Sequence, residues 1–280
     1  MLKTRTMTRE DISFAVDRAG AEGWNPGLHD GQVFYSTDEN GFLIGEIDGR
    51  PVGCISAVSY EGSFGFVGFY IVIPEMRGRG IGLQIWNAAM SRLDGHNIGL
   101  DGVVDQQDNY GKSGFKLCYR NIRFEYTSAG SEQMMPKQLI AIDTSMRNAI
   151  YDYDRQCFPL ARKRFLDGWL AMPDSTALAF VEGGELHGYG VIRKCRNGFK
   201  IGPLFANDAN IAQALFDGLC LGVNKGESVY LDVPEINRAA LELAERYDMK
   251  MVFETARMYT GVPPTVDIDK VFGVTTFELG

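Results

Sequence analysis

The chain has little of what marks secreted, membrane or nucleic-acid-binding proteins. Its five cysteines are widely spaced and never form Cys-x-x-Cys, which argues against a disulfide framework and a zinc site. The net charge is −8, so attraction to phosphate backbones or anionic lipid is not expected. The start lacks the apolar core of a signal peptide, and no run approaches the ~18 apolar residues that span a bilayer. We therefore expect a cytoplasmic protein with no bound metal, nucleic acid or membrane.

Length and composition favour two folded domains. A chain of 280 residues with 45 % hydrophobic and 23 % charged residues is typical of an ordinary folded protein, and two domains of about 140 residues each are expected at this length. The segment 127–133 is polar and contains a flexible glycine, as linkers do. We place the boundary there, which predicts domains over residues 1–128 and 134–280.

The first domain shows a mixed α/β pattern with a hairpin-rich beginning. Asp48-Gly49 between two β-rich runs is a strong hairpin signal. In chain order the predicted elements are a short first strand, an N-capped helix over 8–22, strands over 41–47, 50–60 and 64–73, a helix over 80–93, a strand over 98–104, a short helical or loop piece around 109–110, and a strand pair over 115–126.

The pattern recurs weakly after the linker. The hairpin at Glu182-Gly-Gly-Glu corresponds to Asp48-Gly-Arg-Pro, Tyr230-Leu-Asp232 to Leu100-Asp101, and Arg257-Met-Tyr259 to Phe124-Glu-Tyr126. All three pairs are separated by about 131 to 135 residues, so an internal duplication is more economical than coincidence.

The stretch Arg77-Gly-Arg-Gly80-Ile-Gly82 lies between a predicted strand and a predicted helix. Its glycines allow a tight turn whose amide hydrogens converge at the helix N-terminus, and the helix dipole adds to their attraction for an anion. A dinucleotide fingerprint would need a glycine at Leu83, and a P-loop ending at Lys112-Ser113 would need one at Gln106. An anion site that is neither of these two nucleotide motifs is therefore predicted.

The loop resembles the pyrophosphate-binding loop of the GNAT superfamily of acyl-CoA-dependent N-acyltransferases. That loop reads Arg/Gln-x-x-Gly-x-Gly/Ala after a strand and before a helix, and Arg77, Gly80 and Gly82 match it. A second family signature, Tyr-x-x-x-Gly-Phe, is matched by Tyr110-Gly-Lys-Ser-Gly114-Phe115 at the expected distance. Two motifs in the right order and setting are more specific than either one alone.

The resemblance implies acetyl-CoA as cosubstrate and direct attack of a neutral amine on the thioester. It implies that backbone groups of Ile71, Val72 and Ile73 bind the pantetheine arm, and that Tyr110 is the general acid that protonates the leaving sulfur. Asn109 is a further candidate CoA contact. The pyrophosphate would be held by Arg77, Gly78, Arg79, Gly80, Ile81, Gly82 and Leu83.

The general base is less well defined by the sequence. Asp101, Glu46 and Asp30 are the candidates, and Asp101 is the one we assign. Trp24, His29 and Tyr70 are candidates for lining the acceptor pocket, although ordinary packing or surface placement explains each of them equally well.

The second domain resembles the degenerate C-terminal domain of tandem GNAT proteins. The counterpart of the anion loop, residues 201–210, has no Arg-x-x-Gly-x-Gly, and Asp208 would repel a pyrophosphate. The segment 151–169 is rich in aromatic residues and arginine, and we hypothesise that Arg162 and Arg164 recognise an acidic group on the acceptor; a solvated basic helix face is the plainer alternative.

The expected fold is α/β with two GNAT-like domains, each a mostly antiparallel, twisted sheet flanked by helices. The expected function is N-acetyltransfer to the primary amine of a small molecule. Two alternatives stay open: a CoA-binding regulatory module without acyl transfer, and a protein N-acetyltransferase. A homodimer is also left open.

Overall fold

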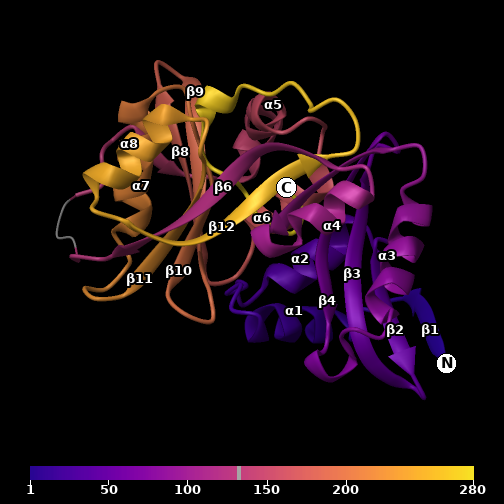
Figure 1. Cartoon of the computed structure of the whole chain (residues 1–280). Helices are drawn as coiled ribbons and strands as arrows, with labels where there is room; N and C mark the ends of the chain where they lie inside the picture. The colour runs from indigo at the N-terminus through magenta and orange to yellow at the C-terminus, as the bar shows by residue number, and fades with distance from the viewer. Residues whose placement is uncertain (131–133) are drawn as a thin grey trace.

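The computed structural model describes residues 1–130 and 134–280, so residues 131–133 of the predicted linker lie outside the described part. Two α/β halves share a single sheet of 13 strands within these ranges, as Figure 1 shows. The first half comprises residues 1–130 and the second half residues 134–280.

The first half follows the predicted order of elements closely. The Asp48-Gly49 turn joins the strand Phe42–Ile47 to the strand Arg50–Tyr60 with φ of 50° and 73°, the left-handed backbone that a two-residue hairpin needs. The elements of the first half are β1 (Leu2–Thr6), α1 (Ile12–Ala21), α2 (Asp30–Thr37), β2 (Phe42–Ile47), β3 (Arg50–Tyr60), β4 (Phe64–Val72), η1 (Pro74–Met76), α3 (Ile81–Arg92), β5 (Asn97–Val103), η2 (Val104–Gln106), α4 (Gln107–Lys112) and β6 (Lys116–Thr127).

The second half repeats this order of strands and helices, which supports the predicted duplication. Its elements are β7 (Leu139–Ala141), η3 (Thr144–Met146), α5 (Arg147–Cys157), α6 (Lys163–Leu170), β8 (Ser175–Glu182), β9 (Glu185–Lys194), β10 (Phe199–Ala206), α7 (Ala209–Cys220), β11 (Ser228–Pro234), α8 (Arg238–Arg246), β12 (Lys250–Tyr259), η4 (Ile268–Lys270) and β13 (Val271–Gly273). The turn at Gly183-Gly184 joins β8 to β9 as predicted.

Three predicted elements differ from the structure for local reasons. The first helix begins at Ile12, because the Asp11 carboxylate pairs with Arg5 and caps no helical amide. The strand pair predicted over 115–126 is one long strand, β6. The segment 151–169 forms two helices, α5 and α6, since Pro159 disfavours helical backbone at Phe158, which is extended.

The two halves exchange one strand each at the centre of the sheet. The strand order is β1-β2-β3-β4-β5-β12-β6-β11-β10-β9-β8-β7, so β12 of the second half pairs with β5 of the first. Strand β6 of the first half reciprocally pairs with β11 of the second, and β6 and β12 pair with each other (Figure 1). Each half is therefore completed by a strand of the other, which the expectation of two separate sheets did not foresee.

Equivalent buried ion pairs fasten the exchanged strands. Arg257 on β12 binds Asp101 on β5 through two hydrogen bonds of 2.7 and 2.6 Å. Arg123 on β6 binds Asp232 on β11 in the same way, at 2.6 and 2.8 Å. Planar guanidinium groups suit this bidentate pairing in buried positions. The repetition of the pair across the exchange is independent support for the duplication.

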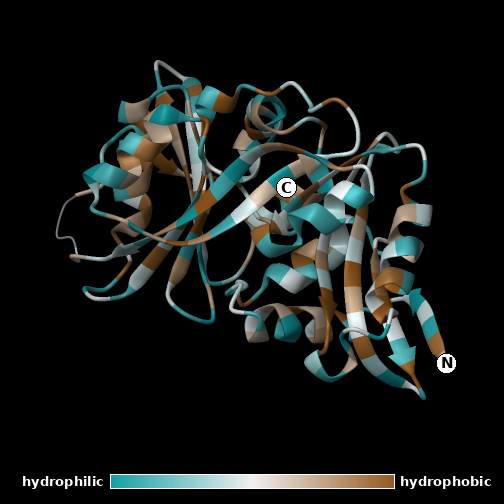
Figure 2. Cartoon of the chain, in the orientation of Figure 1, coloured by the Kyte–Doolittle hydropathy of each residue, from teal (hydrophilic) through white to brown (hydrophobic). Residues whose placement is uncertain are grey.

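Both faces of the first half's sheet are covered. Along β3, Cys54 and Val58 pack with α1 and α2, whereas the alternating Ile55 and Ala57 pack beneath α3. Figure 2 shows hydrophobic residues concentrated along β3 and β4. Trp169 on α6 of the second half is fully buried and stacks on Phe34 of α2, so this core is built from both halves.

Candidate active site

Strands β4 and β5 open a gap at the centre of the first half. They pair in parallel only from Phe64 to Val67, opposite Asn97 to Leu100. Beyond that point β4 carries a bulge, because Ile55 of β3 faces two residues, and Phe69 adopts a positive φ of 48°. The bulge turns β4 away while β5 continues alongside β12. Polar backbone groups of β4 are thus left facing an opening between the strands.

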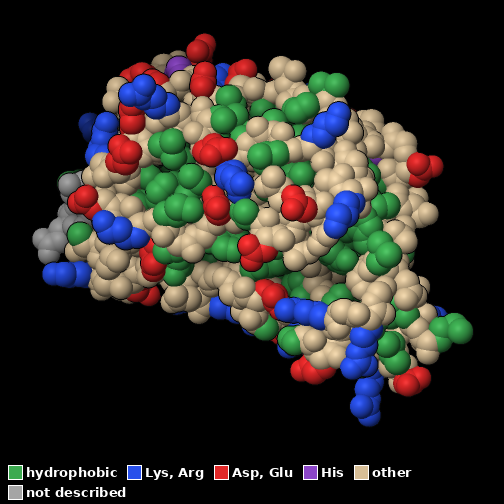
Figure 3. All heavy atoms as spheres, in the orientation of Figure 1, with side chains coloured by type: hydrophobic (Ala, Val, Ile, Leu, Met, Phe, Trp, Pro, Cys, Tyr) green, Lys and Arg blue, Asp and Glu red, His purple; other side chains and the backbone are tan. Residues whose placement is uncertain are grey.

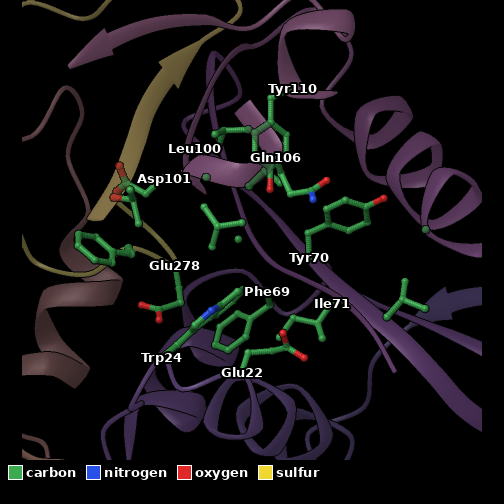
Figure 4. A pocket seen from close by; sticks show the side chains of 18 of the residues that line it. Glu22, Trp24, Phe69, Tyr70, Ile71, Leu100, Asp101, Gln106, Tyr110 and Glu278 are labelled. Atoms are coloured by element: carbon green, nitrogen blue, oxygen red, sulfur yellow. The ribbon is translucent and has the colours of Figure 1, made fainter. Parts of the chain in front are cut away.

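A cavity of about 480 Å³ occupies this opening. Figure 4 shows side chains entering it from both β4 and β5 and from the second half. The lining residues are Glu22, Trp24, Val67, Gly68, Phe69, Tyr70, Ile71, Val72, Arg77, Gly78, Gly82, Trp86, Leu100, Asp101, Gly102, Val103, Gln106, Tyr110, Phe253, Thr255, Phe277 and Glu278. Most of the wall is apolar or aromatic with a few acidic groups, as in many small-molecule sites.

The predicted anion loop lies at one end of this cavity. Gly78 and Gly80 both have φ of 73°, a left-handed backbone that side chains disfavour, and α3 starts directly after Gly80. Among the described residues, no hydrogen bond occupies the amide hydrogens of residues 78–83. Those amides and the positive end of α3 form the kind of nest that binds phosphate groups. The loop therefore fits the pyrophosphate of a CoA molecule.

The structure places some predicted cofactor residues on the cavity wall and others behind it. Ile71, Val72, Arg77, Gly78 and Gly82 line the cavity. The other predicted cofactor residues, which do not line it, are Ile73 and the loop residues Arg79, Gly80, Ile81 and Leu83, of which Leu83 is 62 % exposed. Asn109 also lies away from the wall, where it hydrogen-bonds Gln106 and Lys112.

Arg77 braces the loop with its side chain. Its Nε donates to the Val72 carbonyl at 2.8 Å, and its guanidinium pairs with Glu22 of the segment that follows α1. The side chain thereby links the end of β4 to another wall of the cavity, which fixes the loop's orientation.

Tyr110 reaches the cavity from α4, as Figure 4 shows. Its ring packs on Trp86 with centroids 5.6 Å apart, and the glycine at position 102 leaves room for it, because a Cβ there would lie 2.2 Å from the ring. Burial raises the pKa of Tyr110 to about 12. The hydroxyl is therefore protonated throughout the physiological range and available as a donor.

Asp101 also lines the cavity, but both of its oxygens are engaged. Arg257 binds the two oxygens, and the Asn121 amide donates to Oδ1 at 2.8 Å. Burial raises the pKa of Asp101, with Arg257 acting against it. A proton could be accepted only at the expense of this ion pair, which weakens the case for Asp101 as a base.

The other predicted acceptor-site residues divide in two. Trp24 and Tyr70 line the cavity, whereas His29 lies outside it and pairs with Asp174. The alternative bases Asp30 and Glu46 do not line it either, because the first pairs with Arg193 in the interior and the second with Arg5.

The hypothesis that Arg162 and Arg164 recognise the acceptor is not supported. The Arg162 side chain is fully buried, where it binds Asp154 through both oxygens and donates to the Thr275 hydroxyl. Arg164 is exposed and pairs with Glu39 on the surface. The buried arginine ties α6 to α5 and is not free to meet a ligand.

Glu278 is one of the lining residues that the sequence did not indicate. The segment 275–280 has no motif, yet it packs against β4, where a Cβ on Gly68 would lie 2.3 Å from the Glu278 carbonyl oxygen. The Tyr60 hydroxyl donates to the Leu279 carbonyl at 2.9 Å and holds the segment in place. Only its position in the fold, close to the cavity, reveals the residue.

The equivalent opening in the second half is closed. β10 pairs with β11 from Phe199 to Ile201 and then diverges from it, but β13 fills the gap by pairing with β10 at Leu204 and Phe205. Asp208 caps α7 by accepting hydrogen bonds from the Asn210 and Ile211 amides at 2.8 and 3.0 Å. A carboxylate of the chain thus occupies the place that corresponds to the anion site.

Both halves match known acetyltransferase families. Residues 11–115 match the Acetyltransferase (GNAT) family, and residues 150–273 match a second family described as Acetyltransferase (GNAT) domain. The chain belongs to the GNAT superfamily as a tandem protein and is an acyltransferase.

The similarity to other proteins extends over nearly the whole chain. The chain is 28 % identical over 272 residues to "Holothin acyltransferase" of Pseudoalteromonas sp. (strain SANK 73390), with 97 % of this chain and 92 % of that protein covered. A putative acetyltransferase from Pyrococcus horikoshii has the same fold, with a TM-score of 0.84, 21 % identity, and 100 % and 96 % of the two chains covered. A tandem GNAT protein from the clavulanic acid biosynthesis pathway gives a TM-score of 0.65 at 12 % identity, covering 92 % and 98 %.

The surface and composition of the described residues add three observations. No helix in the described ranges is long and apolar enough to cross a membrane. No cluster of three or more His, Cys, Asp or Glu side chains suited to a metal ion is found among the same residues. On the face seen in Figure 3, basic and acidic side chains are interspersed over most of the surface, and a few basic side chains lie close together at its lower edge.

Proposed function

We propose that this chain transfers an acetyl group from acetyl-CoA to the primary amine of a small molecule. The observation that carries the proposal is the continuity of one cavity, which has the anion loop at one end and aromatic and acidic side chains at the other. A CoA thioester whose pyrophosphate lies on residues 77–83 would extend its pantetheine arm along the polar backbone of β4.

The residues of this chain have distinct tasks in direct transfer. The loop amides and the N-terminus of α3 bind the negative pyrophosphate. Backbone groups of Ile71 and Val72 face the cavity and can hydrogen-bond the amides of the arm. Tyr110 donates its hydroxyl proton toward the sulfur as the carbon–sulfur bond breaks, which stabilises the charge that develops there.

The acceptor side favours a small molecule over a protein. Phe253, Phe277 and Glu278 of the second half form part of the cavity wall. Because these side chains close that side of the cavity, they leave less room for a segment of polypeptide than for a small molecule. The name of the similar protein, holothin acyltransferase, gives holothin as the acceptor and mentions no protein acceptor. Protein N-acetylation is the less favoured alternative for these reasons.

Thiol release tests the proposal directly. The purified chain is mixed with acetyl-CoA and a panel of primary amines, free thiol is followed with a thiol-reactive dye, and the acetylated amine is identified by mass. We expect amine-dependent thiol release. Tight acetyl-CoA binding without release for any amine would favour the CoA-binding regulatory module, and acetylation of peptides but not of small amines would favour the protein N-acetyltransferase.

A further inference from the structure

The segment 275–280 belongs to the second half in sequence but contributes to the first half's cavity. Leu279 is fully buried and Glu278 is 5 % exposed. Figure 1 shows the C-terminus at the middle of the molecule, where the two halves meet. Because the Tyr60 hydroxyl and the glycine at position 68 fix the main chain here, the Glu278 side chain is held in position rather than trailing in solvent.

Three carboxylates line the cavity, and two of them are already paired. Glu22 binds Arg77, and Asp101 binds Arg257. Among the described residues, no hydrogen bond or ion pair engages the carboxylate of Glu278. An unpaired buried carboxylate is costly, and such groups are kept where they meet a ligand or transfer a proton.

The surroundings of Glu278 suit a cation with an apolar body. Figure 4 shows its carboxylate beside Trp24, with Asp101 farther away and Tyr110 pointing into the cavity from another side. Phe69 and Phe277 add aromatic surface to the same wall. Aromatic faces attract ammonium groups and also bury the apolar carbon skeleton that carries them.

We propose that Glu278 binds the ammonium group of the acceptor and takes its proton, so that the acceptor is a primary amine that is cationic in solution and carries an apolar or aromatic body. The inference deepens the proposed function and rests on it. It assigns to the second half a group that acts at the reacting atoms of the first.

The proton balance of the step is simple. The ammonium gives one proton to the Glu278 carboxylate, and the freed nitrogen lone pair forms the new bond to the thioester carbon. When the carbon–sulfur bond breaks, Tyr110 gives its hydroxyl proton to the sulfur, and the second proton lost by the nitrogen passes through solvent to restore the Tyr110 hydroxyl. Glu278 then returns its proton to solvent, and one amide, one thiol and one proton have been formed.

The electrostatic environment supports a base that titrates above an ordinary glutamate. Burial raises the pKa of Glu278 above 4.5, because few water molecules solvate its charge. The charged and titratable groups that face it from neighbouring elements are Lys200, Arg123 and Arg193, which lower the pKa, and Asp30, which raises it, with Glu22, Asp101 and Tyr110 on the cavity wall. A base of this kind gives kcat/KM an acid limb above pH 4.5, since activity is lost as the carboxylate is protonated.

The test compares Glu278→Gln with the wild type, using the full chain, acetyl-CoA, and 2-phenylethylamine, tryptamine and benzylamine as acceptors. We expect kcat/KM to fall by about 10²- to 10³-fold, in the lower part of the usual contribution of a general base, and the acid limb to disappear. The affinity for acetyl-CoA, measured by calorimetry, stays within about twofold, because Glu278 lies outside the anion loop. Glu278→Asp keeps the charge and should recover at least tenfold of the loss.

Glu245→Gln is the matched control, because it makes the same chemical change on the exposed surface of α8. An unchanged rate and pH profile in Glu278→Gln would overturn the inference while leaving the proposed function intact. A rise in the amine KM with the acid limb retained would overturn the proton-transfer role. Absence of thiol release from the wild type with every amine, despite bound acetyl-CoA, would defeat the proposed function itself.

Discussion

Replacing Asp101 by Asn tests whether this residue is an ion-pair partner or a catalytic base. The substitution keeps the shape of the side chain but leaves the Arg257 guanidinium, whose side chain is 9 % exposed, without its counter-charge. Removing one partner of a buried pair typically costs about 3 to 5 kcal/mol, because the remaining charge is buried alone. At roughly 2 to 4 °C per kcal/mol for a chain of this size, the melting temperature should fall by about 6 to 20 °C.

Two further variants make the measurement decisive. Asp232→Asn breaks the equivalent pair with Arg123 and should cause a similar fall, since its geometry is the same. The double variant Asp101→Asn, Arg257→Gln removes both charges and should recover more than half of the lost stability, because replacing a whole buried pair is often nearly neutral. Melting is followed by circular dichroism at fixed protein concentration.

The double variant also separates structure from catalysis. Once its stability is restored, its kcat should fall by less than the roughly 100-fold that loss of a general base costs. A melting temperature for Asp101→Asn within about 1 °C of the wild type would refute the ion-pair reasoning. A stable double variant whose kcat drops by 100-fold or more would show that the Asp101 carboxylate itself takes part in the reaction.

Three other substitutions probe the cofactor end of the cavity and its closed counterpart. Tyr110→Phe should lower kcat by about 10²-fold with little change in acetyl-CoA affinity, measured by thiol release and calorimetry; an unchanged kcat would remove Tyr110 from the mechanism. Gly80→Ala should weaken acetyl-CoA binding by about tenfold, because its φ of 73° strains alanine in the anion loop, whereas Gly62→Ala at φ of 70° strains a distant turn and should affect stability alone; equal affinities would contradict this. Asp208→Ala should cost about 1 kcal/mol of stability as a lost helix cap and leave one CoA site per chain by calorimetry; a second site would show that β13 does not close the gap.

Features that depend on neighbouring residues could be predicted from the sequence. In the hairpin turn, Asp48 and Gly49 both adopt the left-handed backbone conformation that an Asp-Gly pair predicts. The glycines of the anion loop adopt the positive φ that a tight turn before a helix requires, and the repeated order of elements agrees with the predicted duplication. In each case the physical cause acts between residues that are close in the sequence, so the local sequence pattern is enough to predict the structure.

Features that depend on distant partners could not be predicted in the same way. The sequence of β6 is equally compatible with pairing in its own half or in the other half, because hydrophobic alternation does not specify the partner strand. Arg162 resembles a surface residue in the sequence, and only the position of Asp154 and Thr275 reveals that it is buried. Glu278 likewise has no neighbours in sequence that suggest chemistry, because its setting is made by Gly68 and Tyr60, more than 200 residues away.

The strand exchange connects the closed half to the open one. β12 pairs with β5 on the edge that faces away from β4, so β5 stays held in the sheet where β4 diverges from it and the cavity lies between β4 and β5. The chain that leaves β12 then forms β13, which fills the gap of the second half, and continues directly to Glu278 in the cavity of the first. Freeing the second gap for a ligand would displace β13 and, with it, the segment that carries Glu278. The closed gap of the second half and the completed cavity wall of the first half are therefore two consequences of the same stretch of chain.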